Sequence, residues 1–474
     1  MNKRKIYLVS AMVCLLFSNI HAQVGYKPVS VNYINLSDDA IVTAQPIQTK
    51  KLKISPSKKL NSPIEIQLQE IINSHLSGIG GAFNEQGGEA FMSLNKKSQK
   101  DLARKLFNVK KGIGFSMCRT AVGSSDFGLD AYSYNETPED YEMKHFSVKR
   151  DEKSVIPFIN AAYSQNEELK MFASPWSPPG WMKYSGKMDG GNKDKKNNKL
   201  KADAKIYEAY ALYFSKYIQE YAKNGIQINR LLIQNETDMN PSYPGCDMSP
   251  EQMAELVFDY IRPTFKKAGI KTEIWAGTFR GARKDAEKFL TLKRSKTIDG
   301  IGLQYCGRDQ IKSLNSDYPD MNFMHTEGRC EHGENSMKQA RKRFGEVCMW
   351  LNGGCDNFCY WNIVLNENST SAWGWKQNSL IKIDRKAKTV TYNPDYAPIA
   401  LLSKFIRPGD QSLKTKAPAG LDVLAVRNDK SLVIFLQNDS KNVSIKQLKV
   451  ADKLYDVELP ATSLCAFVFK VKKY

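Results

Sequence analysis

Two glutamates, each at the end of a short apolar run, have the type and placement that acid–base chemistry requires. The run Ile226–Glu236 is rich in β-branched residues and stops on a glutamate, before a loop of turn-forming residues. The run Met321–Glu327 ends in the same way. Each pattern predicts a buried strand that places a carboxylate at its C-terminal end. We expect Glu236 and Glu327 to share one site, because cleavage of a glycosidic bond needs an acid for the leaving oxygen and a nucleophile or base for the sugar carbon.

The elements that would hold these glutamates repeat along the chain. From Gly78 onward, short apolar runs alternate with segments of helical period. Eight such runs are Gly78–Phe83, Ile113–Arg119, Lys170–Trp176, Arg230–Glu236, Glu273–Thr278, Gly300–Cys306, Asn322–Glu327 and Asn357–Val364. Eight strands alternating with helices predict a (β/α)₈ barrel, whose active site lies at the C-terminal ends of the strands. Glu236 and Glu327 would then end the fourth and seventh strands.

Helix signals fill the segments between these runs. Apolar and aromatic residues recur every three or four positions before a closing glycine, at Ile206, Tyr210, Tyr213, Tyr217, Tyr221 and Gly225. Ser249 followed by Pro250 predicts the start of another helix, which Pro263 should kink or end. A third helix is predicted from Ser336 to Leu351, before two glycines.

Both ends of the chain predict a β-domain. After a helix at Tyr396–Ile406, strands are expected at Val423–Arg427, Leu432–Gln437, Val443–Val450, Leu454–Leu459 and Leu464–Val471. Near the N-terminus the strand-like pieces are Val29–Leu36, Ile41–Gln45 and Ile64–Leu68. We therefore predict an α/β fold, with a barrel over residues 76–394 and an appended antiparallel β-sandwich. Residues 23–75 and residues 395–474 together build that sandwich.

Residues 1–22 predict a secretory signal peptide. Lys3, Arg4 and Lys5 precede the apolar run Ile6–Phe17, and residues 20–22, which read IHA, offer a cleavage site. The apolar run is shorter than a membrane-spanning helix requires, which disfavours the alternative of a retained anchor. We expect a secreted protein, periplasmic or at the cell surface, without stable membrane insertion after signal cleavage.

Composition narrows the classes of partner. The chain has 474 residues, 42% of them hydrophobic, and a formal net charge of +19. Its lysines are spread along the chain without a nucleic-acid-binding motif, so we expect a solvated basic surface and no nucleic acid partner. Cys118 and Cys306 fall inside predicted strands, where buried thiols are expected. The pair Cys355 and Cys359 lacks further ligands at zinc spacing, and we expect no metal or cofactor.

Six motifs between about residues 78 and 378 resemble glycoside hydrolase family 30, the glucosylceramidase-like family. In chain order they lie at 80–83, 119–127, 173–183, 234–236, 326–327 and 360–362, and they read GGAF, RTxxGSSDF, ASPWSPPxWMK, QNE, TE and YWN. The resemblance implies a retaining β-glycosidase with a barrel and a sandwich made from both chain ends. It also implies that Glu236 is the acid/base and Glu327 the nucleophile.

Further residues are expected to bind the substrate: Arg119, Asp126, Trp176, Asn235, Gln304, Tyr305, Trp361 and Asn378. In the family, the position of Asn235 contacts the sugar 2-hydroxyl, and those of Asp126 and Trp176 hold remote hydroxyls. Arg119 could pair with the nucleophile, or merely balance charge inside the barrel. Trp176 and Trp361 offer flat faces for a pyranose ring, whereas the alternative for any tryptophan is core packing, as expected for Trp275 and Trp350.

The expected reaction is hydrolysis of a β-glucosidic bond by double displacement, with a β-1,6-glucan or related β-linked oligo- or polysaccharide as substrate. Residues 304–306, 328–332 and the basic loop 184–202 depart from the family pattern, so the sugar stays open among β-glucoside, β-xyloside, β-fucoside, β-galactan and glucosylceramide. His325 and His332 could tune the pKa of Glu327 or be plain core and surface residues. The rival classes are an inactive carbohydrate-binding protein and a binder of anionic polymers.

Overall fold

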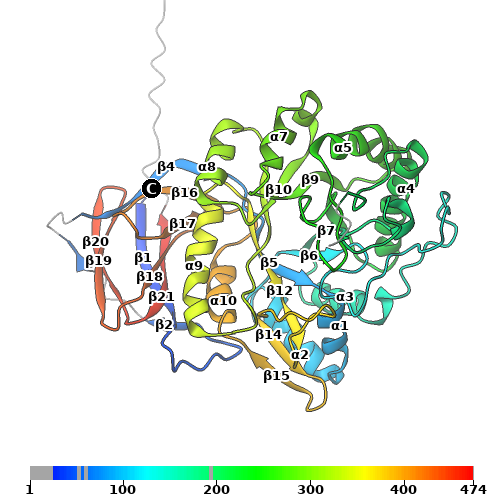
Figure 1. Ribbon diagram of the computed structural model, residues 1–474. Coiled ribbons are helices and arrows are strands. Elements are labelled where there is room, and N and C mark those ends of the chain that lie inside the picture. The colour runs from blue at the N-terminus through cyan, green and yellow to red at the C-terminus, as the bar shows by residue number, and fades with distance from the viewer. Residues whose placement is uncertain (1–24, 51–54, 58–61, 192–195, 473–474) are drawn as a thin grey trace, which may run out of the picture.

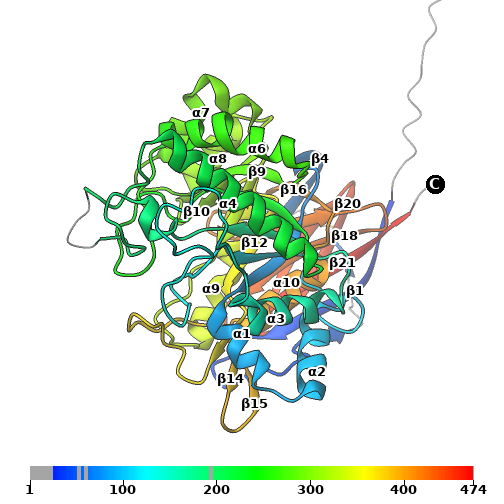
Figure 2. The same ribbon diagram turned by 90° about the vertical axis from the view of Figure 1, so that its right-hand side faces the viewer.

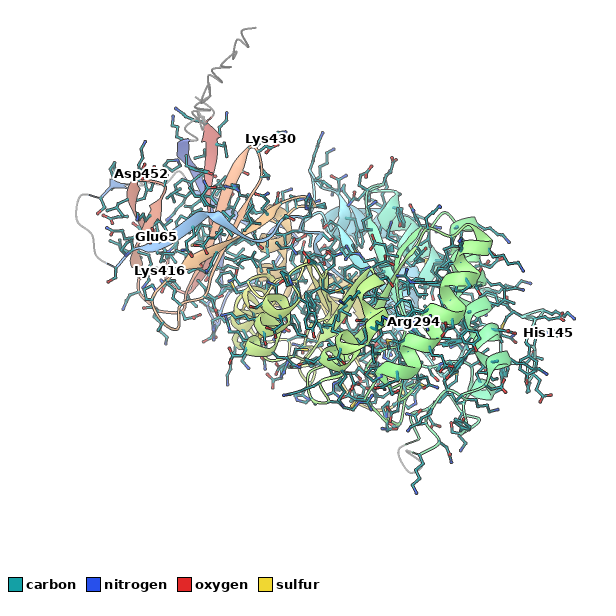
Figure 3. All side chains as sticks on the ribbon, turned by 90° about the horizontal axis from the view of Figure 1, so that it is seen from above. Glu65, His145, Arg294, Lys416, Lys430 and Asp452 are labelled. Atoms are coloured by element: carbon teal, nitrogen blue, oxygen red, sulfur yellow. The ribbon has the colours of Figure 1, made fainter. Side chains whose placement is uncertain are left out.

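The computed structural model describes residues 25–50, 55–57, 62–191 and 196–472. The predicted signal peptide, residues 1–22, lies outside them. Two bodies lie side by side: strands β1 and β16–β21 form one end of the molecule, and the barrel strands with their helices form the other (Figure 1). Seen from above, Glu65, Lys416, Lys430 and Asp452 mark the first end, and His145 lies at the far edge of the barrel (Figure 3).

Eight parallel strands form the barrel, and the fold prediction is confirmed. They are β5 (Gly78–Phe83), β6 (Met117–Ala121), β7 (Lys170–Ser174), β8 (Ile228–Leu232), β9 (Glu273–Arg280), β10 (Gly300–Gln304), β11 (Phe323–Glu327) and β12 (Asn357–Asn362). Their hydrogen-bonded order is β11-β10-β9-β8-β7-β6-β5-β12. The circle closes between β11 and β12, where the Asp356 backbone N donates to Phe323 O (2.9 Å) and Gly328 N donates to Cys359 O (2.7 Å).

Close packing of the first two barrel strands explains the glycine-rich sequence of β5. A side-chain carbon placed at Gly80 would lie 1.8 Å from the carbonyl oxygen of Met117 on β6. Only glycine fits this contact, so the motif GGAF has a structural reason independent of chemistry. Inside the barrel an apolar layer of Met117, Phe172, Trp275 and Met324 fills the space below the strand ends.

Helices cover the outside of the barrel (Figure 2). They are α1 (Glu85–Met92), α2 (Lys96–Phe107), α3 (Val155–Tyr163), α4 (Ala204–Lys223), α5 (Pro250–Glu255), α6 (Arg262–Ala268), α7 (Asp285–Thr291), α8 (Arg308–Asp317), α9 (Met337–Leu351) and α10 (Tyr396–Phe405), with short 3₁₀ turns at Asp151–Lys153, Gly180–Met182 and Lys293–Thr297. Ser249 and Ser336 cap α5 and α9 as the sequence indicates, since their hydroxyls accept from Gln252 N and Gln339 N.

Pro263 was predicted to kink or end its helix, and the helix does not end there. A π-helical turn at Leu256–Ile261 joins α5 to α6, and the helix runs on to Ala268. Pro263 therefore stands at the beginning of α6, where a missing N–H costs least. The helix ends at Gly269, whose φ of +69° suits glycine.

The second body is a ten-stranded sheet made from both chain ends. Its order is β2-β1-β21-β18-β17-β16-β4-β19-β20-β3. The strands are β1 (Gly25–Asn35), β2 (Gln48–Lys50), β3 (Ser55–Pro56), β4 (Ile64–Asn73), β16 (Gln411–Lys416), β17 (Val423–Arg427), β18 (Ser431–Asn438), β19 (Ser444–Val450), β20 (Lys453–Leu459) and β21 (Ser463–Lys472). The pairs are antiparallel except β4 with β19. The sheet folds around its own core, which includes Val31, Ile66, Ile434 and Phe467.

Three features of this region were not predicted correctly. Ile41–Gln45 was expected to be a strand, but it is irregular and Ile41 is 89% exposed. Strand β16 was missed, because its pattern of Ser, Lys and Thr is too polar to mark a strand. A small sheet of β13 (Val364–Asn366), β14 (Ile381–Asp384) and β15 (Thr389–Tyr392), which follows the last barrel strand, was also missed, although Ile381 and Ile383 alternate with polar residues in β14.

One face of the sandwich packs on the barrel helices. Leu424 and Phe435 belong to the core of the barrel, whereas their chain neighbours Ala425 and Ile434 belong to the core of the sandwich. Because side chains alternate along a strand, β17 and β18 are buried on both faces and join the two bodies. Among the described residues, no helix has the length and apolar character needed to cross a membrane.

Candidate active site

Glu236 is presented where the chain leaves the barrel ladder. Strand β8 ends at Leu232, four residues before the predicted end, and Glu236 has a φ of +45°. The departing segment is held by its neighbours, since Asn235 N donates to Pro175 O (2.8 Å) and Gln234 N donates to Gly277 O (3.0 Å). Glu236 is 9% exposed. The backbone therefore turns the carboxylate over the mouth of the barrel.

Glu327 is the last residue of β11 and is 6% exposed. Arg119 Nη1 donates to its Oε2 at 2.7 Å, and the Tyr305 hydroxyl donates to its Oε1 at 2.5 Å. An ionised carboxylate is an acceptor only, so these two donors suit the charged form of Glu327. The arrangement fixes both oxygens of one carboxylate.

Arg119 ties the two glutamate strands together. It lies within β6, which continues two residues past the predicted end at Arg119 to Ala121. Its Nη2 donates to Asn235 Oδ1 and to Ser174 Oγ, both at 2.7 Å, while Nη1 holds Glu327. The side chain is completely buried. A buried guanidinium with this set of partners fixes Asn235 and Glu327 relative to each other.

Glu236 has weaker partners than Glu327. Gln304 Nε2 donates to its Oε1 and the Tyr243 hydroxyl donates to its Oε2, both at 3.3 Å. Arg280 lies 3.7 Å away. Burial raises the pKa of Glu236 to about 7, and the negative charge of Glu327 adds to the rise. Glu236 therefore retains a proton near neutral pH, whereas Glu327 accepts hydrogen bonds from two donors. Two carboxyl groups in such different environments can divide the roles of acid and base in glycoside cleavage.

Asp126 and Trp361 carry buried polar atoms without partners. Asp126 Oδ1 and Trp361 Nε1 make no hydrogen bond within the described part of the chain. Burial, then the charges of Glu327 and Glu236, raise the pKa of Asp126 well above its usual value. An unpaired buried acceptor and donor are costly, and a ligand with hydroxyl groups would satisfy both.

The tryptophans expected to pack against a sugar are largely covered. Trp176 and Trp361 stack with ring centroids 5.0 Å apart and are 2% and 1% exposed. The Arg119 guanidinium lies 4.5 Å from the ring of Trp176 and 5.4 Å from that of Trp361. These rings form the floor beneath Arg119. Trp275 and Trp350 are buried in the core, as expected.

Asn378 and His325 make their hydrogen bonds away from the two carboxylates. The side chain of Asn378 accepts from Asn335 N (3.1 Å) and lies 3.5 Å from Asp395, and its role in substrate binding stays a prediction. His325 points out of the barrel, although regular alternation would place it on the same face as Glu327, because the register of β11 against β10 shifts between these two residues. Its ring stacks on Phe358 and accepts from Cys359 N, and burial lowers its pKa to about 3. The interaction of His325 with Glu327 is with the backbone of that residue, and His332 is exposed.

Sequence reasoning missed three contacts of the site. The Thr278 hydroxyl lies 2.6 Å from Gln304 Oε1 and 3.2 Å from Asn235 Oδ1, and Arg280 ends the same strand, β9. Their position at the end of a predicted barrel strand could have found both. Tyr243 lies in a loop without periodicity, and no pattern in the sequence places its ring beside Glu236.

The described residues contain no group of three or more His, Cys, Asp or Glu side chains that could hold a metal ion. Their eight cysteines are all free thiols, and seven are buried.

Comparison with known proteins gives a consistent picture. Residues 76–270 match the glycosyl hydrolase family 30 TIM-barrel domain. The chain is 26% identical over 460 residues to putative glucosylceramidase 3 of Caenorhabditis elegans, covering 89% of this chain and 85% of that protein. It is 32% identical over 206 residues to an endo-1,6-β-D-glucanase of Trichoderma harzianum, covering 42% of each chain. A solved endo-β1,6-glucanase structure superimposes with a TM-score of 0.81 at 21% identity, over 94% of this chain and 99% of that one.

Proposed function

We propose that this chain, a member of glycosyl hydrolase family 30 and a β-glycoside hydrolase, is secreted and cleaves β-1,6-linked glucosyl bonds with retention of configuration. The observation that carries the mechanism is the unequal setting of its two glutamates. Glu236 has a pKa raised to about 7, and Glu327 accepts from Arg119 and Tyr305. The first suits a general acid and the second a nucleophile.

The reaction then proceeds in two displacements. In the first, a Glu327 oxygen attacks the anomeric carbon, the bond to the leaving oxygen breaks, and Glu236 gives its proton to that oxygen. In the second, Glu236 takes a proton from water as the water oxygen attacks the same carbon, and the bond to Glu327 breaks. Two inversions leave the product with the β-configuration of the substrate.

The sugar-binding roles of Asp126 and Trp361 rest on buried polar atoms that have no hydrogen-bond partner among the described residues. Asp126 Oδ1 and Trp361 Nε1 would pair with hydroxyls of the bound ring. Asn235, fixed by Arg119 through its Oδ1, keeps its Nδ2 available for the 2-hydroxyl. A hydrogen bond at that position can strengthen as the transition state forms.

The preference for a β-1,6-glucan rests on the relatives, three of which are named endo-1,6-β-D-glucanases at 32%, 31% and 29% identity. The test is hydrolysis of β-glucans of defined linkage, together with aryl β-glucosides, β-xylosides, β-fucosides and β-galactosides, by the purified chain. We expect cleavage of the β-1,6-linked glucan in preference to the others. Preferred turnover of another sugar or linkage would refute the substrate, and turnover of none would favour a binding-only protein.

A further inference from the structure

Three aromatic side chains at the edge of the site retain exposed surface. Tyr243 lies in the loop after β8, and Trp373 and Trp375 lie between β13 and β14; all three are partly buried. The ring centroid of Tyr243 lies 4.8 Å from that of Trp375 and 6.4 Å from that of Trp373. Trp176 and Trp361 are covered by each other and by Arg119, and Tyr305, which is also partly buried, has Arg280 and Arg329 over its ring at 5.8 Å. These three rings are therefore the aromatic group available for a ligand on the Glu236 side of the site.

The aromatic group lies beside the proposed acid. The Tyr243 hydroxyl donates to Glu236 Oε2 at 3.3 Å. Strands β8 and β12 stand on opposite sides of the barrel, so the contact between Tyr243 and Trp375 spans the mouth of the barrel. The group therefore borders Glu236 at the mouth of the barrel.

Both loops are held in place before any ligand binds. Ser371 N donates to Trp375 O (2.8 Å), Gln86 Nε2 donates to Thr370 O (2.8 Å), and Gly374 takes a φ of +98° that favours glycine. The Tyr243 loop is fixed by the buried Lys183, whose Nζ donates to Gly245 O at 2.7 Å. A rigid aromatic surface binds a rigid ring with little loss of conformational entropy.

We propose that Tyr243, Trp373 and Trp375 bind the sugar ring on the leaving side of the scissile bond. The proposal rests on the proposed function, in which Glu236 protonates the leaving oxygen. A group that touches Glu236 from the solvent side is then next to the ring that departs. The C–H faces of a glucosyl ring pack against aromatic rings. The ring of Tyr243 is inclined by 56° to that of Trp375 and by 63° to that of Trp373, so the three side chains can contact one sugar ring with both faces and edges.

This site makes an oligosaccharide the preferred substrate over a glucoside with a small leaving group. The test compares two substrates in the wild type and in Trp375→Ala: gentiobiose, a β-1,6-linked glucose disaccharide, and β-glucosyl fluoride. Fluoride brings no sugar ring to the leaving side and needs little proton donation. We expect the ratio of kcat/KM for gentiobiose to kcat/KM for the fluoride to fall about tenfold or more in the variant.

Further variants keep the result interpretable. Trp375→Phe should restore most of the ratio, and Trp373→Ala should lower it less than Trp375→Ala, since its ring lies farther from Tyr243. Tyr141→Ala is the control, because it removes an exposed aromatic side chain elsewhere and should leave the ratio unchanged. Tyr141 belongs to the same loop as His145, which lies at the far edge of the barrel (Figure 3). The proposal would be overturned if Trp375→Ala left the ratio of the two kcat/KM values unchanged. It would also be overturned if Trp375→Ala and Trp373→Ala each lowered kcat/KM equally for both substrates.

Two other results separate this site from the proposed function. If Trp375→Ala loses activity on gentiobiosyl fluoride, relative to glucosyl fluoride, the aromatic group binds a ring on the retained side and the proposal is wrong. If the wild type cleaves glucosyl fluoride but neither gentiobiose nor a longer β-1,6-linked glucose oligosaccharide, the β-1,6 linkage is wrong. In that case the ratio is measured with an oligosaccharide that the wild type does cleave in place of gentiobiose. The proposed aromatic site is thus tested even when the proposed linkage fails.

Discussion

Removal of the negative charge at Glu327 should lower the pKa of Glu236 by a measurable amount. Burial is the larger cause of the raised value of about 7, and Glu327 is the second. Carboxylates of a retaining pair lie about 5–5.5 Å apart. Two charges at that distance, at an effective dielectric constant of about 20, interact by about 3 kcal/mol, or about 2 in pKa.

The change of about 2 in pKa is an upper limit, because Arg119 and Tyr305 contact Glu327 and offset part of its charge. We therefore expect the pKa of Glu236 to fall by about 1 to 2 in Glu327→Gln, and to stay above 4.5 because burial persists. The variant does not turn over, so the assay is ¹³C NMR titration of labelled glutamate side chains, with Glu236→Gln assigning the signal.

Glu346→Gln is the matched control, since it removes a partly buried carboxylate that pairs with Arg343 and not with Glu236. It should leave the pKa of Glu236 unchanged. In the wild type, kcat/KM should fall as pH rises through about 7, because the acid must be protonated. An unaltered Glu236 titration in Glu327→Gln would refute the argument that the two charges interact.

Three further variants test individual contacts. Tyr305→Phe removes the 2.5 Å hydrogen bond to Glu327 and should lower kcat/KM about 10- to 100-fold, so a change below twofold would contradict the contact's importance. Arg119→Met leaves Glu327 buried without its cation and should reduce the free energy of unfolding in urea by about 3–5 kcal/mol; equal stability would show that the pair is neutral. Asp151 accepts from Tyr132, Tyr134 and Tyr221, yet burial raises its pKa to about 6, above its usual 3.8. Its stabilising contribution is thus full below about pH 4 and is lost as pH rises through 6. Wild-type stability should fall by about 3 kcal/mol over that range, and Asp151→Asn should lack the dependence.

The barrel could be predicted because its strands are apolar and regularly spaced, while the ends of those strands could not. Strand β8 stops at Leu232 because the chain leaves the ladder to present Gln234, Asn235 and Glu236, and apolar character continues through Ile233. The spacing of apolar residues indicates which side chains are buried, and these residues are buried whether or not their backbone pairs in the sheet. The sequence pattern therefore does not mark where the strand ends. The strand-end rule still brought Glu236 and Glu327 to the same face of the barrel.

The site's supporting contacts depend on loops that carry no periodic signal. Arg119, at the end of its predicted strand, was expected either to pair with Glu327 or only to balance charge, and it pairs with Glu327. Asn378 was named by resemblance in a loop, where its side chain accepts from Asn335 N, and its substrate-binding role stays a prediction. Tyr243 and Trp375 meet across the barrel mouth from segments more than a hundred residues apart, which no local pattern in the sequence encodes. The domain boundaries and the catalytic roles stay predictions.

The central claim, that Glu327 forms a covalent bond to the sugar, is tested most directly by trapping that bond. The wild-type enzyme would be incubated with 2-deoxy-2-fluoro-β-glucosyl fluoride, whose electronegative substituent slows the second displacement, and its peptides would be analysed by mass spectrometry. We predict one added fluoroglucosyl group, carried by Glu327 and absent in Glu327→Gln. A label on Glu236, or turnover of the natural substrate with an α-configured first product and no label, would contradict the mechanism.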